Sequence, residues 1–176
     1  MLTIGHSART SDDFIAILRA HGVNLLVDVR TIPKSRHNPQ FNIENLPGAL
    51  QEAGIDYRHI PELGGLRHAR ADSINTGWKN ASFRGYADYM QTPTFSAALT
   101  ELTRIAEGRH SAVMCAEAVP WRCHRSMIAD ALTVRGERVE HILSETKRSP
   151  HALTKFAVVD GTRITYPGEN LGLFDR

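Results

Sequence analysis

The segment from Cys115 to Ser126 concentrates the residue types that carry chemistry in proteins. It contains two thiols, one carboxylate, one imidazole and two guanidinium groups in a single short stretch. We expect it to join a strand to the beginning of a helix, where free backbone N–H groups attract anions and lower the pKa of a nearby thiol. Cys115, at the strand end, and Cys123, beside the helix start, are both candidates for a reactive thiolate, and the sequence does not choose between them.

Each of these residues also has a purely structural interpretation. A cysteine that ends an apolar strand is commonly a small buried hydrophobe. The arginines could simply pair with Glu117 or with helix carboxylates, and His6 could cap its own turn. Asp28 lies inside an apolar strand and must be paired if it is buried, so we expect it to hold a nearby arginine or backbone amide in place.

Further polar residues follow the other expected strands. Ligands of open parallel sheets bind beyond the carboxyl ends of the strands, so these residues are expected to converge. We predict that one cleft gathers His6, Glu62, Cys115, Glu117 and Arg125. The candidate catalytic residues are Cys115, Cys123, His6 and Glu117; the candidate anion-binding residues are Arg30, Arg122, His124, Arg125 and Ser126; the candidate substrate-loop residues are Ser7, Glu62, Gly64, Gly65, Trp78, Arg84 and Tyr86.

The elements that must position these residues alternate along the chain. Strands are expected at 2–7, 24–30, 55–60, 111–115 and 139–143, and helices at 14–21, 43–53, 83–90, 94–105 and 126–135, with Thr94 as the cap of the fourth helix. This alternation predicts an α/β fold with three layers and a mostly parallel central sheet. The chain should form a single domain over 1–176, with a parallel core at 1–145. Residues 146–176 should form a β-hairpin, turning at Asp160-Gly161, and a tail.

Composition limits the class of protein. A 41% hydrophobic content supplies enough material for one core, and a formal net charge of +2 does not demand nucleic acid. There are two cysteines, no signal-peptide pattern and no stretch near the roughly 20 apolar residues that span a bilayer. We therefore expect a cytoplasmic protein without membrane contact.

Several spaced motifs together resemble a known family. They are Gly5-His6-Ser7, Val27-Asp-Val-Arg30, Asn38-Pro-Gln-Phe41, Pro61-Glu-Leu-Gly-Gly65, Phe83-Arg-Gly-Tyr-Ala-Asp-Tyr-Met90, Met114-Cys-Ala-Glu117 and Cys123-His-Arg-Ser126. This set is similar to the bacterial domain-of-unknown-function family number 488 over nearly the whole chain, a family with no settled reaction.

A second resemblance is partial and concerns rhodanese-like domains. Residues 25–30 are similar to the Leu-Ile-Asp-Val-Arg strand of that group, and 112–143 to its active-site strand, loop, helix and final strand. The resemblance implies a nucleophile at Cys115 and a helix-starting arginine at Arg125, in a rhodanese-like or Rossmann-like sheet. The loop between them is longer than the usual rhodanese or tyrosine-phosphatase loop and carries a second cysteine.

Three functions compete. The leading hypothesis is an enzyme that binds a small anionic, phosphate- or sulfur-containing substrate on the 115–126 loop, as a cysteine-dependent transferase or hydrolase without a cofactor. In this enzyme, His6 or His124 would shuttle protons.

The second hypothesis is a nucleotide or nucleic-acid binding module. It would use Arg30, Lys34, Arg36 and His37 to contact phosphates, and Trp78, Phe83 or Tyr86 to stack on bases. The third is a metal site from Cys115, Glu117, Cys123, His124 and His6, ranked last because Cys-x7-Cys-His lacks paired short spacings.

The C-terminal residues of the chain suggest a protein partner. Asn170-Leu-Gly-Leu-Phe174 is similar to the short peptide by which bacterial DNA-handling proteins engage the replication sliding clamp. Leu171, Leu173 and Phe174 would be its apolar anchors. The alternative is a terminus that docks on its own domain.

Overall fold

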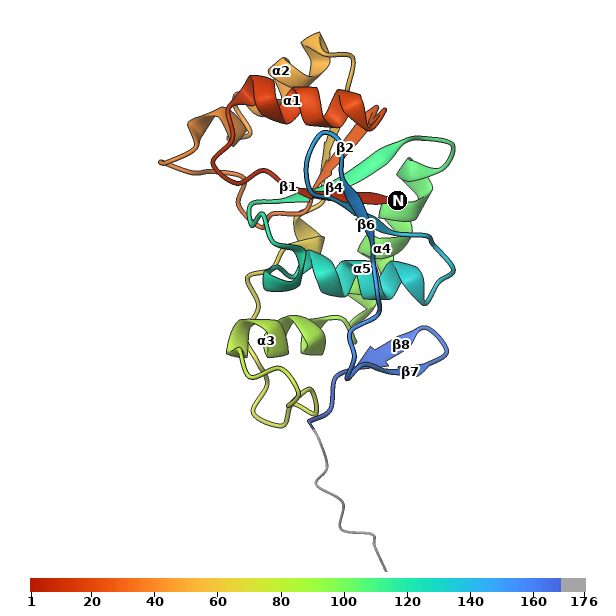
Figure 1. Ribbon diagram of the computed structural model, residues 1–176. Coiled ribbons are helices and arrows are strands. Elements are labelled where there is room, and N and C mark those ends of the chain that lie inside the picture. Colours follow the sequence, from red (N-terminus) through yellow and green to blue (C-terminus); the bar gives the residue numbers. More distant parts are fainter. Residues whose placement is uncertain (169–176) are drawn as a thin grey trace, which may run out of the picture.

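A six-stranded sheet forms the centre of the computed structural model, which describes residues 1–168 (Figure 1). The strand order is β3-β2-β4-β1-β5-β6, and all neighbours are parallel except β6, which runs antiparallel to β5. The strands are β1 (Leu2–Gly5), β2 (Leu25–Asp28), β3 (Asp56–His59), β4 (Ser111–Cys115), β5 (Glu140–Ile142) and β6 (Arg148–Pro150).

Two helices cover one face of the sheet, α1 (Ser11–Ala20) and α2 (Leu46–Glu52) (Figure 1). The side chain of Thr10 accepts a hydrogen bond from the Asp13 amide and so begins α1. Phe14 and Leu46 are fully buried in a core cluster that includes Met114 of the central strand β4. The apolar face of the amphipathic helix α1 thus packs against the sheet.

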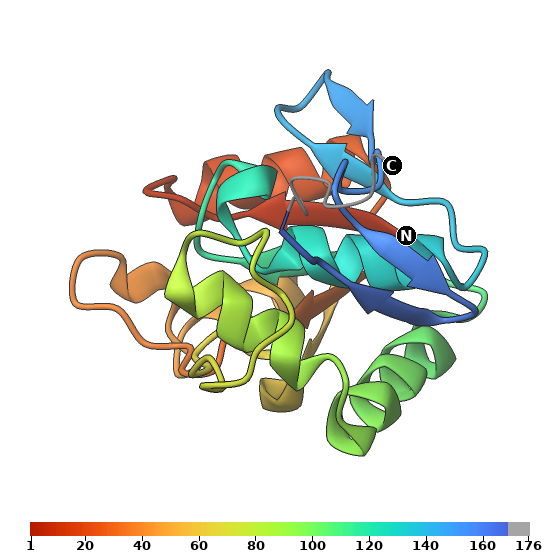
Figure 2. The same ribbon diagram turned by 90° about the horizontal axis from the view of Figure 1, so that it is seen from below.

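On the opposite side of the sheet lie α4 (Pro93–Ala106) and α5 (Arg125–Thr133), and α3 (Ala81–Tyr89) lies on the same side but farther from the sheet than α5 (Figures 1 and 2). Their core cluster includes Leu99 and Ile128, which are packed with Val27 and Val113 of the sheet. Alternate residues of β4 thus serve opposite layers, and Cys115 belongs to the layer of α5. Short 3-10 turns occur at η1 (Pro39–Phe41), η2 (Pro61–Leu63) and η3 (Pro120–Arg122).

A small hairpin of β7 (Val158–Asp160) and β8 (Arg163–Thr165) follows the sheet. Ile164 and Tyr166 enter the same core cluster as α5. The Tyr166 hydroxyl donates to Asp130 Oδ2 at 2.8 Å, which ties the hairpin to that helix.

The α/β class, the mostly parallel sheet and the C-terminal hairpin are confirmed, with local corrections. The hairpin turn is Gly161-Thr162, since Asp160 pairs with Arg163, and Gly161 takes the left-handed φ of +59°. Thr94 is not the cap of α4: the Thr92 side chain accepts from the Phe95 amide, and Pro93 occupies the first turn.

Two further boundaries differ from expectation. The second helix begins at Leu46 instead of residue 43, because Pro47 has no N–H to donate and is tolerated only in a first turn. The antiparallel strand β6 was not predicted, because three residues with no apolar alternation carry little signal. Within residues 1–168, none of the helices has the length and apolarity that a bilayer crossing requires.

Candidate functional site

A cavity of about 420 Å³ opens at the carboxyl edge of the sheet. Three neighbouring strands supply it: His6 follows β1, Arg30 follows β2, and Cys115 ends β4. Cys123 and His124 reach it from the loop before α5, and α3 contributes Ser82 and Phe83 at its rim. The topology therefore brings together residues that are far apart in the sequence.

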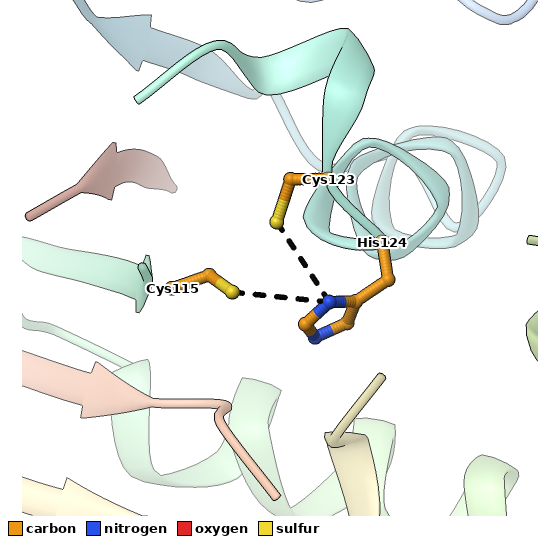
Figure 3. A group of neighbouring side chains, drawn as sticks. All are labelled: Cys115, Cys123 and His124. Carbon is orange, nitrogen blue, oxygen red and sulfur yellow. Dashed lines mark hydrogen bonds between the residues drawn. The ribbon is translucent and has the colours of Figure 1, made fainter. Parts of the chain in front are cut away.

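Cys115, Cys123 and His124 form one cluster at this edge (Figure 3). The two sulfur atoms lie 3.8 Å and 3.7 Å from the same atom, His124 Nδ1. The opposite ring nitrogen, Nε2, lies 3.1 Å from the Val29 carbonyl oxygen. Because a carbonyl only accepts, Nε2 carries the proton of the neutral ring, and the Nδ1 lone pair faces both sulfurs.

The two thiols differ in acidity. A hydrogen bond from Cys123 lowers the pKa of Cys115 well below its ordinary value, and the positive charge of Arg125 acts in the same direction against burial. The pKa of Cys123 is raised well above its ordinary value, first by that same hydrogen bond and then by burial. The interaction between the two thiols thus favours ionisation of Cys115 over that of Cys123.

Arg125 is fully buried beneath the loop. Its guanidinium donates to the carbonyl oxygens of Glu117 at 2.6 Å and Ala118 at 3.0 Å, and its Nε has no hydrogen-bond partner. No ion pair within residues 1–168 includes this arginine. Burial lowers its pKa, while the cysteines oppose that effect. Arg125 thus clamps the loop from below and leaves a positive charge close to the sulfur atoms.

Asp28, Arg30 and His6 form a connected group on the floor of the cavity. Asp28 accepts from the Arg30 backbone amide at 3.0 Å and pairs with its guanidinium at 2.6 Å, so the expectation that Asp28 fixes an arginine is confirmed. Arg30 also donates to the Phe41 carbonyl and to His6 Nε2. His6 Nδ1 donates to the Ser7 carbonyl at 2.7 Å, and its ring stacks on Phe41.

Both ring nitrogens of His6 are therefore occupied. Burial lowers the pKa of His6, with the Arg30 charge acting in the same direction. The ring is neutral at pH 7, and its arrangement suits the positioning of Arg30 better than the proton shuttle that the sequence suggested.

Gly64 and Gly65 allow the loop after β3 to lie directly on the cluster. A Cβ at Gly65 would stand 2.5 Å from His124 Nδ1, and one at Gly64 would stand 2.2 Å from Thr31 Oγ1. Neither distance is compatible with a side chain unless a neighbour moves. These glycines are needed for close approach to the imidazole and to the wall of the cavity.

The cavity does not include every residue that was expected around one cleft. His6, Cys115 and Glu117 line it, whereas Glu62 and Arg125 do not. Glu62 is exposed, because the turn η2 directs it outward. Arg125 begins α5 but faces the loop carbonyls.

Four other expected residues have structural partners. The Tyr86 hydroxyl is buried and donates to the Leu63 carbonyl at 2.8 Å, so this ring offers no face to a ligand. Trp78 packs edge-on against Phe83 and Phe156, and Arg84 donates to the Trp78 carbonyl. Ser126 donates to the Cys123 carbonyl. Tyr86, Trp78, Arg84 and Ser126 are thus absent from the cavity wall.

The loop after β2 contributes residues that the sequence did not assign to a site. Thr31, Ser35 and Asn38 line the cavity, together with the Lys34 that was considered for phosphate binding. The signal for them was the length and polarity of the segment 31–42, which is typical of binding loops. The tail residues Leu171, Leu173 and Phe174 lie outside the described residues, so the sliding-clamp interaction stays a prediction.

The comparisons with known proteins give one result. Residues 10–132 match the family model described as Domain of unknown function DUF488. No curated protein matches the chain, and no solved structure does so either. The match covers more than half of the chain and includes β2, β4, Cys115, Cys123 and His124. With its cavity at the sheet edge and its sulfur–imidazole cluster, this chain belongs to the DUF488 family.

Proposed function

We propose that this protein is an enzyme that binds a small anionic substrate in the cavity and transforms it at the Cys115–Cys123–His124 cluster. The substrate would carry a phosphate- or sulfur-containing group. The observation that carries this proposal is the composition of the cavity wall, which places cationic side chains beside two thiols and an imidazole.

The charges of the wall favour an anion. Arg30, Lys34 and Arg122 line the cavity, and Glu117 is the one acid among its described lining residues. Glu117 Oε1 already accepts a hydrogen bond from the Val119 amide at 3.1 Å. Since Asp28 balances Arg30, the cavity-lining cations without an ion pair among residues 1–168 are Lys34 and Arg122, whose side chains are exposed.

The first experiment measures binding of inorganic phosphate and of thiosulfate by calorimetry. Lys34→Met and Arg122→Met should each weaken binding by roughly tenfold, because each removes a charged hydrogen-bond donor. Arg138→Met is the matched control, since Arg138 is 86% exposed and precedes β5 at the opposite edge of the sheet. Equal affinity in all four proteins, or no binding at millimolar concentration, would remove the proposal.

The second experiment measures turnover. Purified protein is assayed for phosphate release from an aryl phosphate and for sulfur transfer from thiosulfate to cyanide. The enzyme proposal expects one of these reactions to depend on Cys115, so that Cys115→Ser abolishes it while the fold is retained by circular dichroism. Binding without any turnover across such substrate panels would leave a binding protein and contradict the enzymatic part.

A nucleotide is a specific candidate within the same substrate class. Phe83 lines the cavity beside the cationic residues, and an aromatic ring provides a stacking surface for a base. If so, a nucleoside monophosphate should bind more tightly than inorganic phosphate, and Phe83→Leu should abolish the difference. Equal affinities would restrict the proposal to the anionic group alone.

A further inference from the structure

We propose that Cys115, Cys123 and His124 are the protein ligands of a zinc-class metal ion whose fourth coordination position opens into the cavity. The ion deepens the proposed function, because it would supply the electrophilic centre to which the anionic group of the substrate binds. The metal site itself rests on the geometry of the three ligands and is testable without any substrate.

The first support is the spacing of the donor atoms. The two sulfurs and Nδ1 lie within 4.8 Å of one another. With metal–sulfur bonds of about 2.3 Å and a metal–nitrogen bond of about 2.0 Å, tetrahedral angles require a sulfur-to-nitrogen separation of about 3.5 Å. The observed separations of 3.8 Å and 3.7 Å are close to this edge length. Two edges of a tetrahedral face are thus present, and the third, between the two sulfurs, is no longer than 4.8 Å.

The second support is the near symmetry of the two sulfur contacts. A single lone pair on Nδ1 can accept a proton from one thiol at a time, yet it faces both sulfurs at nearly equal distance. A cation bound between the three donor atoms satisfies all of them at once. Figure 3 shows the three side chains pointing toward one another from the end of β4 and the beginning of α5.

The third support is the orientation of His124. Its Nε2–H donates to the Val29 carbonyl, which holds the ring in the tautomer that offers Nδ1 as a ligand. Metal-ligating histidines are characteristically fixed in this way through the other ring nitrogen. The close approach of Gly65 then leaves the ring little freedom to turn away.

The net charge of the proposed metal centre and its surroundings favours an anionic ligand. Two thiolates neutralise a divalent cation, and the buried guanidinium of Arg125 then leaves one positive charge next to the centre. A hydroxide or a substrate anion at the fourth position would complete both coordination and charge. Two sulfurs and one nitrogen form the soft ligand set that selects zinc or iron over magnesium and calcium.

The test begins with the full chain, purified without chelator and with a non-thiol reductant. Mass spectrometry of the metals should find about one zinc or iron per chain. After removal of the metal, Co²⁺ should bind with thiolate charge-transfer absorption and the intense visible bands of a tetrahedral site. His124→Ala and Cys123→Ser should each lower the affinity for Co²⁺ by at least about a hundredfold relative to the wild type.

The matched control is His110→Ala, the same substitution at an exposed histidine next to the opposite end of β4. This variant should keep the metal content and spectrum of the wild type. Because ligand variants could unfold, direct titration of metal-free wild-type protein with Zn²⁺ against a chromophoric chelator provides an independent measurement.

Two outcomes overturn the metal proposal. One is wild-type protein that neither contains metal nor binds Co²⁺ while both thiols remain titratable, and the other is a His124→Ala variant with the wild-type spectrum. In either case, retained binding of phosphate or thiosulfate would keep the proposed function, with Cys115 as a free nucleophile. Loss of anion binding with an intact metal spectrum would instead contradict the proposed function and leave the metal site.

Discussion

At the scale of single residues, the cluster depends on a glycine that contains no reactive group. Gly65 lies against the His124 ring, and an added methyl group would meet Nδ1 at 2.5 Å. A packed site has no space for such a group without displacement of the imidazole. The geometry of the cluster therefore requires the two cysteines and the histidine and, in addition, a glycine at position 65.

We predict that Gly65→Ala retains the fold but lowers metal affinity by roughly tenfold or more, as for loss of an outer-shell contact. The measurement is a Co²⁺ titration together with thermal unfolding. Gly48→Ala is the control: Gly48 lies in α2 with nothing within 4 Å of the added carbon, and alanine there should be neutral or stabilise the helix by about 0.5–1 kcal/mol. Unchanged Co²⁺ affinity in Gly65→Ala would contradict this account.

A second prediction at this scale concerns Arg125. Arg125→Met removes two hydrogen bonds to loop carbonyls and should lower the free energy of unfolding by about 2–4 kcal/mol. Denaturant unfolding measures the effect. Arg104→Met is the control, since its ion pair with Glu101 is exposed and should contribute less than about 0.5 kcal/mol. Equal losses in the two variants would show that the clamp is unimportant.

At the scale of elements, Asp130 of α5 is the point where the hairpin and the segment after β6 meet the core. Its buried carboxyl group accepts from His151 Nε2, from Thr154 and from the Tyr166 hydroxyl. The second ring nitrogen of His151 contacts His141 of β5 at 3.0 Å. One residue of α5 thus holds two separate segments of the chain by hydrogen bonds.

This arrangement predicts a stability loss on acidification. Burial lowers the pKa of His141 to about 4, and the charges of His151 and Arg125 act in the same direction. The unfolded chain, with a histidine pKa near 6.5, therefore binds more protons than the folded chain between pH 6.5 and 4. Stability is fully present above pH 6.5 and is lost as the pH falls through that window, by at most about 1.4 kcal/mol per pH unit from this group.

Denaturant unfolding between pH 7.5 and 4.5 tests the prediction. His141→Gln should flatten the dependence relative to the wild type, while His110→Gln, at an exposed histidine, should keep it. Parallel pH profiles in all three proteins would assign the acid sensitivity to other groups.

At the scale of the whole molecule, the pattern of strands and helices was sufficient to predict a mostly parallel sheet, without β6, and the edge at which the cavity opens. Residues at strand ends, such as His6 and Cys115, were found because topology alone places them. The direction of helix residues was not predictable in the same way. Tyr86 and Arg125 point into the protein because of how α3 and α5 pack, and no local pattern encodes that packing.

Among the three functions inferred from the sequence, the metal site was ranked last for a related reason. Short spacings are needed when one local loop supplies every ligand, but here the end of β4 and the start of α5 are joined by the turn η3 (Figure 3). Cys115 is therefore close to Cys123 and His124 in the structure, although their separation in the sequence did not indicate a metal site.

The C-terminal hairpin and the central sheet are expected to unfold in one cooperative transition. Since Tyr166 of the C-terminal segment is part of the core beside α5, the hairpin should unfold together with the sheet. In a Trp121→Phe background, fluorescence from Trp78, whose ring lies 5.5 Å from that of Tyr166, should report the same transition as far-ultraviolet circular dichroism. Tyr166→Phe should shift both transitions equally, by about 1–3 kcal/mol. Separate transitions would identify the hairpin as an independent unit.

The network of Asp28, Arg30, His6 and Phe41 has a consequence for ligand affinity. Every polar group in it already has a partner, so the floor of the cavity is preorganised before any ligand arrives. The anion that we propose as substrate would then bind without freezing the long Arg30 side chain, whose loss of rotamer entropy took place during folding. The entropic cost of that association would fall mainly on Lys34 and Arg122 at the exposed rim, and substitutions there would change affinity without disturbing the fold.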